Sequence, residues 1–471
     1  MRVLFTHSYF LHFDEKQWKT MQPYAPLGTL FAASFLRENG YEVALHDVMF
    51  LEDPKSITPV LASFKPDMLV IYDDGFNYLT KMCLTNMREA AFEMSAIAKS
   101  FGCTVAISSS DSTDHFNQYL DQGADYIMLG EAEHTLLEIA NGLRDQTINP
   151  ATIAGIAYRD QGKTVRTMAR PVLQDLDSLP LPAWDLADLN TYKQAWINSN
   201  GYFSINMTTT RGCPYKCNWC AKPIYGNRYN ARTPENVFAE LKMLHERYHF
   251  DHIWFCDDIF GLKPGWIKRF AALLNEAGIK IRFKIQSRAD LILKDEQAEA
   301  LAAAGCETVW MGAESGSQKI LDAMDKGITV QQIETAVKQL NAKNIRTALF
   351  LQFGYLEETK DDIRLTLAML RRLMPDEIGI SVSYPLPGTK FYEKVKEELK
   401  QKTNWTDSDE LAMMFHGTYE PDFYKKLHRY VHTYYRQLKN TQQVKRFNLK
   451  AIVKMPLYAL REKQQKKILE A

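Results

Sequence analysis

Short apolar runs alternate with longer amphipathic stretches over the first 145 residues of the chain. Five runs have the length and composition of buried strands: Arg2–His7, Glu42–Asp47, Met68–Asp73, Thr104–Ser109 and Tyr126–Gly130. Helical patterns lie between them, for example Leu27–Asn39 and Lys81–Ser100. Strands that alternate with helices pair in parallel and are covered on both faces. Residues 1–148 are therefore predicted to form a doubly wound, five-stranded parallel sheet of the α/β class.

The pattern breaks between residues 149 and 200. Gly155–Tyr158 and Thr164–Thr167 flank the turn sequence Asp160-Gln161-Gly162, and together they predict a small hairpin. Several prolines follow in residues 179–184, where they favour an extended connection. This part of the chain is predicted to be a hairpin and a linker between two domains.

From residue 201 onward, strand-like and helical patterns alternate again. The six runs of strand length are Ser204–Thr208, His252–Asp257, Arg282–Ser287, Thr308–Ala313, Arg346–Phe353 and Glu377–Tyr384. The helices between them are well marked, such as Pro234–Tyr248, which follows the N-cap residue Thr233. Six such units predict a partial (β/α)6 barrel over residues 201–400, with a helical C-terminal region over 401–471. Functional residues should lie at the C-terminal ends of the barrel strands.

Three of the seven cysteines lie directly after the first predicted barrel strand. Cys213, Cys217 and Cys220 have the spacing C-x3-C-x2-C. Thiolates bind soft metals and iron–sulfur clusters, and three cysteines on a four-iron cluster leave one iron open to a ligand. A zinc site is the alternative, although structural zinc usually takes four ligands. The other cysteines are predicted to be buried apolar fillers: Cys83, Cys103, Cys256 and Cys306.

Charge and hydropathy narrow the choice of partners. The chain has 57 basic and 57 acidic residues, and this balance argues against a nucleic-acid partner. Its N-terminus lacks a signal-peptide layout, and no apolar run reaches the roughly 18–20 residues that span a bilayer, so a cytoplasmic location is expected. The stretch Asn440–Ala471 carries eight Lys or Arg and two Glu among apolar residues. Such a segment packs on its own domain or lies peripherally on an anionic membrane.

The cysteine spacing, with the aromatic Trp219 before the last cysteine, resembles the signature of the radical S-adenosylmethionine (SAM) superfamily. The resemblance implies that the three cysteines bind a [4Fe–4S] cluster and that the amino and carboxylate groups of SAM chelate its open iron. It also implies an electron donor such as flavodoxin or ferredoxin as a partner.

Stretches at the ends of the other predicted barrel strands resemble the same superfamily. The SAM contacts that the resemblance implies are Trp219, Gln286, Arg288, Gly312, Glu314, Ser315 and Gln352. Arg288 is expected to pair with the SAM carboxylate, and Glu314 with a polar or cationic group. The fifth strand departs from the family habit, because Tyr355 and Leu356 precede the glutamate where glycine and proline are usual. The wall around the adenine is therefore expected to differ in shape.

Two adjacent acids, Asp257 and Asp258, follow the second barrel strand. They can cap the following turn at the barrel mouth. They can also bind substrate or transfer a proton, as catalytic residues. The residue pattern supports both interpretations equally.

The first domain resembles the Rossmann-like cobalamin-binding domain that precedes many radical SAM domains. The resemblance rests on Pro26-Leu27-Gly28 at a helix start, Gly40-Tyr41-Glu42-Val43 with Asp47, and Gly130-Glu131-Ala132-Glu133. The cobalamin contacts that it implies are Pro26, Leu27, Gly28, Tyr72, Asp73, Ser108, Ser109, Gly130 and Glu131. No D-x-H-x-x-G motif is present, so no histidine is expected on cobalt. The Ser108-Ser109-Ser110-Asp111 loop replaces a turn that is richer in glycine and histidine in many relatives.

Together the two resemblances imply a cobalamin-dependent radical SAM enzyme. The leading interpretation is a methyltransferase that acts on an unactivated carbon or on phosphinate phosphorus, by way of a 5′-deoxyadenosyl radical and methylcobalamin. A cyclase, ring-rearranging or oxidising enzyme of the same two-domain class is the runner-up. A cobalamin-binding sensor or carrier is the hypothesis from another class. The substrate is expected to be a small molecule or a lipid.

Overall fold

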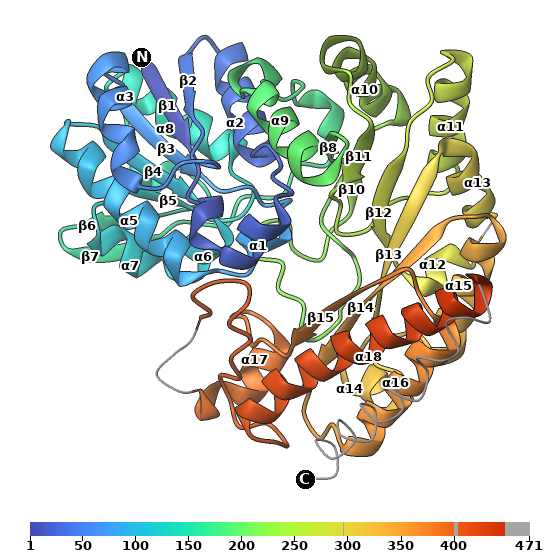
Figure 1. The fold of residues 1–471 in the computed structure, drawn as a ribbon. Helices are drawn as coiled ribbons and strands as arrows, with labels where there is room; N and C mark the ends of the chain where they lie inside the picture. Colours follow the sequence, from blue (N-terminus) through green and yellow to red (C-terminus); the bar gives the residue numbers. More distant parts are fainter. Residues whose placement is uncertain (295, 400–403, 448–471) are drawn as a thin grey trace.

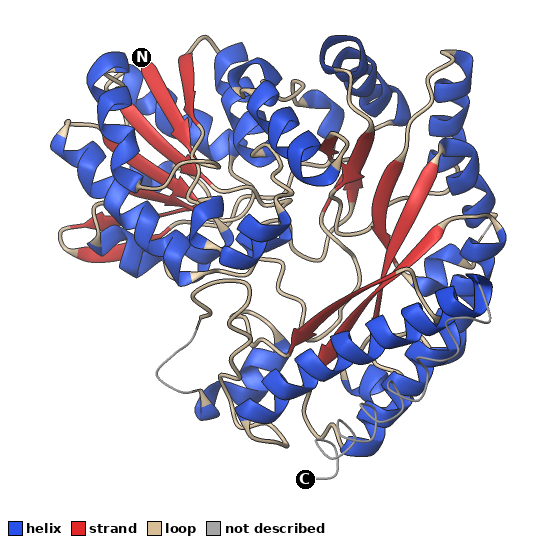
Figure 2. Ribbon diagram, viewed as in Figure 1, coloured by secondary structure: helices blue, strands red, loops and turns tan. Residues whose placement is uncertain are grey.

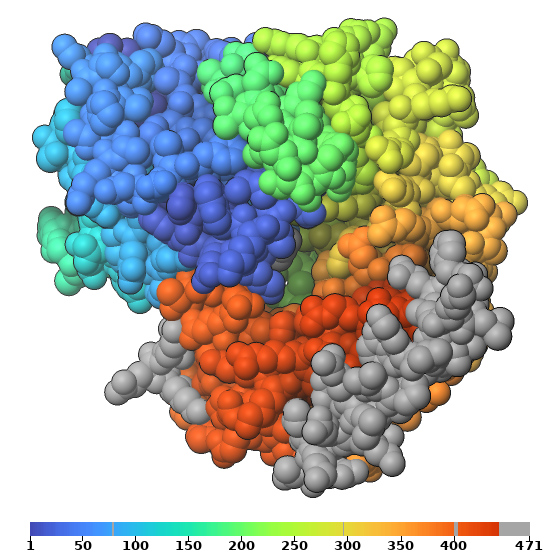
Figure 3. Space-filling view, in the orientation of Figure 1, coloured from blue at the N-terminus to red at the C-terminus, as the bar shows by residue number. Residues whose placement is uncertain are grey.

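The computed structural model describes the chain except for residues 295, 400–403 and 448–471 (Figure 1). Two sheets lie beside each other, and helices cover them (Figure 2). The segment from residue 404 to the end of α18 (Pro421–Phe447) lies against the lower side of both parts (Figure 3). No helix in the described ranges is long and apolar enough to cross a bilayer. Most of the basic stretch 440–471 lies outside the described residues.

The first sheet has the strand order β2-β1-β3-β4-β5-β6-β7. Its strands are β1 (Arg2–Thr6), β2 (Glu42–His46), β3 (Met68–Tyr72), β4 (Thr104–Ser108), β5 (Tyr126–Met128), β6 (Ile156–Asp160) and β7 (Lys163–Arg166). β1 to β5 pair in parallel, as predicted, and β6 and β7 extend the sheet in antiparallel fashion. The hairpin predicted next to a linker is therefore part of this sheet, which has seven strands and not five. It covers the edge of β5, whose backbone would otherwise be unpaired.

Helices on the two faces of the first sheet enclose separate cores. The helices are α1 (Glu15–Thr20), α2 (Leu27–Glu38), α3 (Ile57–Phe64), α4 (Tyr78–Lys81), α5 (Thr85–Ser100), α6 (Ser110–Asp114), α7 (Phe116–Asp121) and α8 (Glu133–Arg144). Leu69 and Ile71 of β3 pack in the core that includes side chains of α3 and α5, whereas Val70 packs in the core of α2 and α8. Both faces of the strand are buried, which explains its continuous apolar sequence.

The second sheet is a curved, entirely parallel half-barrel with the order β15-β14-β13-β12-β11-β8. Its strands are β8 (Ser204–Met207), β11 (His252–Phe255), β12 (Phe283–Ser287), β13 (Cys306–Glu314), β14 (Arg346–Phe353) and β15 (Glu377–Val382). The helices outside it are α10 (Pro234–Tyr248), α11 (Trp266–Glu276), α12 (Ala289–Ile292), α13 (Gln297–Ala304), α14 (Gln318–Ala323), α15 (Val330–Ala342), α16 (Lys360–Leu373) and α17 (Lys390–Val395). The six predicted strands are confirmed, and Thr233 caps α10 through Asn236 N–H.

Two further segments join the sheets. The rest of the predicted linker contains α9 (Leu189–Asn200), whose Trp196 indole donates to the Pro23 carbonyl over 2.7 Å. The loop before α18 reaches back to the first domain, where Thr85 N–H donates to the Trp405 carbonyl over 2.9 Å. The chain between and after the sheets therefore holds them together.

The sheets meet around one buried arginine. Arg211 lies on the short strand β9 (Thr210–Arg211), directly after the first barrel strand. Its guanidinium bonds Glu131 over 2.5 Å and Glu133 over 2.7 Å, and both glutamates follow β5 of the first sheet. Phe31 and Phe76, also from the first domain, lie 5.5 and 5.7 Å from the guanidinium. Burial lowers the pKa of Arg211, but the two carboxylates more than reverse this and raise it.

Replacing this arginine should destabilise the whole chain. Arg211→Met would leave two buried carboxylates without a cation, and we expect a loss of about 3–5 kcal/mol in the free energy of unfolding. Chemical denaturation measures it. Arg364→Met is the control, because Arg364 pairs with Asp361 on the exposed surface, where such pairs contribute at most about 1 kcal/mol. Equal losses in the two variants would contradict the role of Arg211.

Candidate functional site

The cysteine loop, residues 212–229, is closed at its base by a small antiparallel clip. β9 pairs with β10 (Asn230–Ala231) on the other side of the loop. Gly212 opens the loop with a φ of 79°, and a Cβ there would lie 2.5 Å from the Arg228 carbonyl oxygen. Only glycine fits this close approach, because it tolerates positive φ and has no side chain. The loop therefore leaves the end of the first barrel strand in a defined direction.

The three cysteines of this loop are free and partly exposed. Burial raises the pKa of the Cys213 thiol, and burial together with Asp258 raises that of Cys220 to about 12. Among the described residues, no group of three or more His, Cys, Asp or Glu side chains is placed to hold one metal ion. Three cysteines on one loop supply the thiolate ligands that a four-iron cluster with one open iron requires.

Two buried cations stand beside the cysteine loop. The Arg288 guanidinium lies 3.8 Å from the Cys217 sulfur and 3.7 Å above the Tyr215 ring centroid. It also bonds Asp290 over 2.9 Å and the Lys326 carbonyl over 2.9 Å. The Lys326 ammonium lies 5.8 Å from the Trp219 ring centroid. Lys326 was not among the site residues predicted from the sequence, because it follows α14 and lies outside every motif that the sequence showed.

Lys326 is paired with Glu314 at the end of β13. The Lys326 Nζ atom donates to a Glu314 carboxylate oxygen over 2.6 Å, and both side chains are buried. Burial lowers the pKa of Lys326, but Glu314 and Cys217 outweigh this and raise it. A Cβ at Gly312 would lie 2.5 Å from each of the two paired atoms. Gly312 therefore provides the space in which this ion pair forms.

Three buried polar atoms at this end of the barrel have no hydrogen-bond partner in the described structure. They are the Trp219 indole nitrogen, the Ser287 hydroxyl and the Thr210 hydroxyl. Unsatisfied buried groups are rare and costly, and they require an explanation such as a ligand. Unpaired donors of this kind at the barrel mouth suit a polar ligand such as SAM. Ser287 was missed in the sequence, where it lies between two predicted contacts.

The adjacent acids Asp257 and Asp258 have different surroundings. Asp257 is buried and accepts four hydrogen bonds, from the hydroxyls of Thr208 and Thr209 and the backbone N–H groups of Thr209 and Thr210. Asp257 therefore caps the loop after the first barrel strand, and not the turn that follows Asp257 in the chain as the capping interpretation expected. Asp258 is partly exposed and pairs with Lys81 of the first domain over 2.5 Å. The Lys81–Asp258 pair therefore bridges the domains beside Cys220.

The remaining predicted barrel residues differ in orientation. The Ser315 hydroxyl bonds Thr366 of α16 over 3.1 Å, which turns it toward the helix layer. The Gln352 amide donates to the Ser383 hydroxyl over 3.0 Å. Gln286 is partly exposed, and its backbone carbonyl accepts from Phe260. The Ser315 and Gln352 side chains are thus each bound to a neighbouring element of the barrel.

Loops at the C-terminal edge of the first sheet form a dense hydrogen-bonded surface. Asp73, after β3, accepts from Ser8 N–H over 2.7 Å and from the Ser8 hydroxyl over 2.9 Å. Burial raises the pKa of Asp73 to about 6. Gly28 N–H donates to Asp74 over 3.2 Å, and a Cβ at Gly28 would lie 3.3 Å from the Asp74 Cα atom. The loops after β1 and β3 and the start of α2 are thus packed against one another.

The other residues predicted at this edge are accounted for as follows. Ser109 caps α6 in a capping box with Ser112, and the buried Ser108 accepts Asp73 N–H at its carbonyl. Pro26 precedes α2, Leu27 is in the core, and Tyr72 is buried. Glu131 is fully engaged by Arg211 and by Leu173 N–H. A Cβ at Gly130 would lie 3.4 Å from the Ile224 carbonyl of the cysteine loop.

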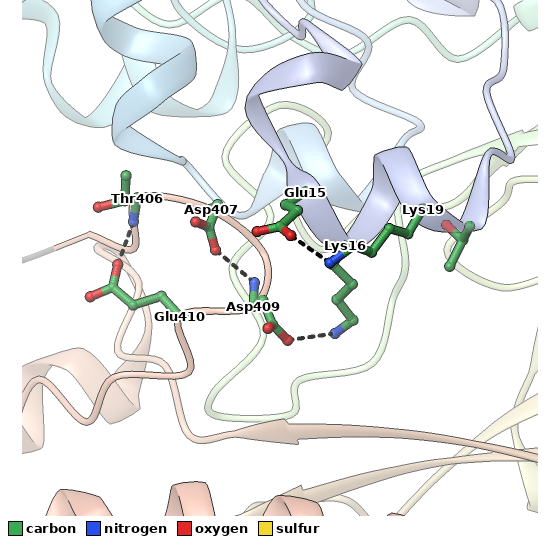
Figure 4. Close-up of a pocket in the computed structure, with 8 residues that line it drawn as sticks. Glu15, Lys16, Lys19, Thr406, Asp407, Asp409 and Glu410 are labelled. Atoms are coloured by element: carbon green, nitrogen blue, oxygen red, sulfur yellow. Dashed lines mark hydrogen bonds and ion pairs between the residues drawn. The ribbon is translucent and has the colours of Figure 1, made fainter.

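A surface pocket lies elsewhere, between α1 and the loop 406–410 (Figure 4). Its lining residues are Glu15, Lys16, Lys19, Thr20, Thr406, Asp407, Asp409 and Glu410. None of the predicted site residues lines it. The chemistry-bearing residues are instead gathered where the barrel mouth meets the first sheet.

Comparison with known proteins agrees with this arrangement. Residues 207–370 match the family model of the Radical SAM superfamily. An uncharacterized methyltransferase of Pyrococcus horikoshii is 28% identical over 84% of this chain and 84% of its own length. An anaerobic magnesium-protoporphyrin IX monomethyl ester cyclase of Rubrivivax gelatinosus is 24% identical over 85% of this chain and 71% of its own length.

Solved structures match the two-domain fold. The methyltransferase TsrM of Kitasatospora setae, with tryptophan substrate and a SAM analog bound, covers 84% of this chain and 76% of its own with a TM-score of 0.68 and 21% identity. OxsB, with aqua-cobalamin and SAM bound, covers 99% of this chain and 71% of its own with a TM-score of 0.74 and 18% identity. The chain has the fold of cobalamin-dependent radical SAM enzymes. Residues 207–370 form a domain of the Radical SAM superfamily, and such a domain implies a [4Fe–4S] cluster and SAM.

A buried carboxyl group after the fifth barrel strand should make the stability of the fold depend on pH. Glu358 is fully buried, one carboxylate oxygen accepts from Gly354 N–H over 2.7 Å, and the other has no hydrogen-bond partner among the described residues. Burial raises the pKa of Glu358 from 4.5 to about 8. Between these two values the unfolded chain releases a proton that the folded chain keeps, so stability should fall as the pH rises.

Glu358→Gln should remove this contribution. We expect its melting temperature to exceed that of the natural chain at pH 8, with a much smaller difference at pH 4.5, as measured by calorimetry. Glu357→Gln is the matched control, because the neighbouring Glu357 is exposed; its pH profile should follow that of the natural chain. A Glu358→Gln profile as steep as the control would contradict the assignment.

Proposed function

We propose that this radical SAM enzyme is a cobalamin-dependent methyltransferase acting on an unactivated carbon or on phosphinate phosphorus. The observation that carries the proposal is the contact between the cysteine loop and the C-terminal edge of the first sheet. Tyr225 of the loop stacks on Phe76 with ring centroids 5.7 Å apart. Ile224 packs at Gly130. A cofactor on that edge, where ligands bind in such sheets, would lie beside a cofactor in the barrel mouth.

The barrel residues have assignable roles toward the cluster and SAM. Cys213, Cys217 and Cys220 would hold the cluster. Arg288 and Lys326, both beside the loop, would pair with the SAM carboxylate. The indole N–H of Trp219 and the Ser287 hydroxyl would donate to polar SAM atoms. When bound, these cofactors supply a 5′-deoxyadenosyl radical, and cobalamin supplies a methyl group.

The first domain would hold cobalamin without a histidine on cobalt. His7, at the relevant sheet edge, is bound to Asp47 over 2.9 Å, and Asp47 accepts from Tyr192 over 2.7 Å. The backbone around Gly28, Asp73, Ser108 and Gly130 is left as the surface for the corrin and its tail. These contacts support a cobalamin that would be held by the loops of this edge, with His7 engaged by Asp47.

Asp258 is the acid we propose for contact with the substrate. It is partly exposed beside the cysteine loop, whereas Asp257 has its hydrogen-bonding capacity taken by the loop of three threonines. Lys81 pairs with the Asp258 carboxylate in the free protein. A polar substrate group would take the place of Lys81 beside Asp258. The proposed substrate is a small molecule or a lipid, and the proposed electron donor is a flavodoxin or ferredoxin. A cytoplasmic location, with peripheral membrane contact through the basic C-terminal stretch, is part of this proposal.

A cyclase, ring-rearranging or oxidising reaction without methyl transfer is the second candidate. The Rubrivivax gelatinosus relative, named as a cyclase, covers 85% of this chain and favours it. A cobalamin sensor or carrier would not need the unpaired polar atoms at the barrel mouth, and these atoms argue against it.

The cluster assignment predicts a selective loss of iron. Changing Cys213, Cys217 and Cys220 together to alanine should abolish iron binding and SAM cleavage after anaerobic reconstitution, because no thiolate remains in the loop. Cobalamin binding should persist, since the first domain is unaltered. Cys306→Ala is the control, because Cys306 is buried at the start of β13, at the opposite end of that strand from Glu314. Iron retained by the triple variant would reject the cysteine assignment.

Methyl transfer predicts two adenosyl products in near-equal amounts. With substrate supplied, one SAM should yield S-adenosylhomocysteine as its methyl group is transferred, and a second should yield 5′-deoxyadenosine. Chromatography of an anaerobic reaction with labelled SAM measures both. A cyclase needs only the second cleavage, so product formed with 5′-deoxyadenosine alone would favour the second candidate.

A further inference from the structure

Tyr355, the residue that departs from the family habit after the fifth barrel strand, does not face open space. Its side chain is 1% exposed. Its hydroxyl lies 2.8 Å from the Asn218 side-chain oxygen and 3.1 Å from the Ala323 carbonyl. Asn218 is the residue that directly follows Cys217 and stands two residues before Cys220. The unusual tyrosine therefore binds the cysteine loop.

Asn218 is held from several sides of the barrel. Its side-chain amide donates to the Ala323 carbonyl over 2.7 Å, and its backbone N–H donates to the Met324 carbonyl over 3.0 Å. Its backbone carbonyl accepts from Phe391 N–H over 2.9 Å. The end of α14 and the start of α17 thus share one residue of the loop. A loop residue with this many partners has little freedom to move.

The ring of Tyr355 is itself fixed. It stacks on Phe391 with centroids 5.1 Å apart and an interplanar angle of 27°. Phe391 in turn packs edge-on against Phe415 with centroids 5.2 Å apart. Because the ring cannot turn away, the hydroxyl remains directed at Asn218. Tyr355, Asn218 and Phe391 form a unit that we call the loop clamp.

We propose that Tyr355 and Asn218 are positioning residues, which set the spacing between Cys217 and Cys220 through the loop clamp. The inference deepens the proposed function, because it concerns the loop assigned to the cluster. A tyrosine that only filled space would have no need of its hydroxyl. Here the hydroxyl is the group that reaches the loop, and it does so from a position where glycine or proline could not.

The first test uses the chain without cofactors. Hydrogen–deuterium exchange reports the opening of the Asn218 N–H···Met324 bond. Tyr355→Phe keeps the stacked ring and removes only the hydroxyl, and one lost hydrogen bond corresponds to an exchange rate about fivefold faster in peptides covering residues 213–222. In an Asn218→Ala background, the same change should add little, because the partner is already absent.

Tyr435→Phe is the matched control. The Tyr435 hydroxyl is also buried and donates to the carbonyls of Pro375 and Asp376 over 2.7 Å, but it does so at the start of β15. Its removal should leave exchange in the cysteine loop unchanged. Unchanged loop exchange in Tyr355→Phe, or equal acceleration by Tyr435→Phe, would overturn the proposal.

The second test uses the anaerobically reconstituted holoenzyme. Tyr355→Phe should release iron to an Fe²⁺ chelator about fivefold faster than the natural chain, and the paramagnetic resonance spectrum of its reduced cluster with SAM should change. Tyr435→Phe should match the natural chain in both measurements. Equal release from all three proteins would also overturn the proposal. If the natural chain takes up no iron, the proposed function fails, whereas the exchange experiment still decides whether the clamp exists.

Discussion

The buried contact between Arg211 and the two glutamates of the first sheet is the interaction on which the arrangement of the domains depends. Arg211 lies shortly after the first barrel strand and immediately before the cysteine loop. Glu131 comes from the loop after β5, and Glu133 begins α8. Because a guanidinium with such partners cannot leave them without exposing unpaired buried charges, the two strand ends are held together. The direction in which the cysteine loop leaves the barrel follows from this contact.

Charge is balanced around the cysteine loop in a way that suits a zwitterionic ligand. Arg288 and Lys326 stand beside Cys217, and Glu314 compensates Lys326. A bound carboxylate would find two cations within reach, while an ammonium group would find Glu314. Buried charges are costly unless they are paired. These three side chains pair with protein groups in the free chain, and the charged groups of a ligand would replace those partners.

Relatives with the same two-domain fold carry names of different reactions, including methyltransferases and cyclases. A common radical-generating centre can serve several outcomes, because the outcome depends on which group lies nearest the substrate. In this chain the partly exposed Lys81–Asp258 pair crosses from one domain to the other beside Cys220.

Sequence reasoning predicted the two α/β domains, all eleven parallel strands within a few residues of their bounds and the position of the cysteine loop, because buried strands and capped helices leave local patterns. The predicted ends of β5, β11 and β15 each lie two residues beyond the observed ones. The same reasoning missed that the hairpin extends the first sheet, since antiparallel pairing with β5 joins segments about 30 residues apart.

The sequence by itself determined the barrel, the cysteine triad and the set of polar residues at the strand ends. Only the tertiary structure decided their partners: Glu131 binds Arg211, Asp257 binds the threonine loop, and Tyr355 binds Asn218. Glu131 and Arg211 are 80 residues apart, and Tyr355 and Asn218 are 137 apart. A local pattern records which face of an element is buried, but a hydrogen bond between distant loops leaves no periodic trace in one sequence.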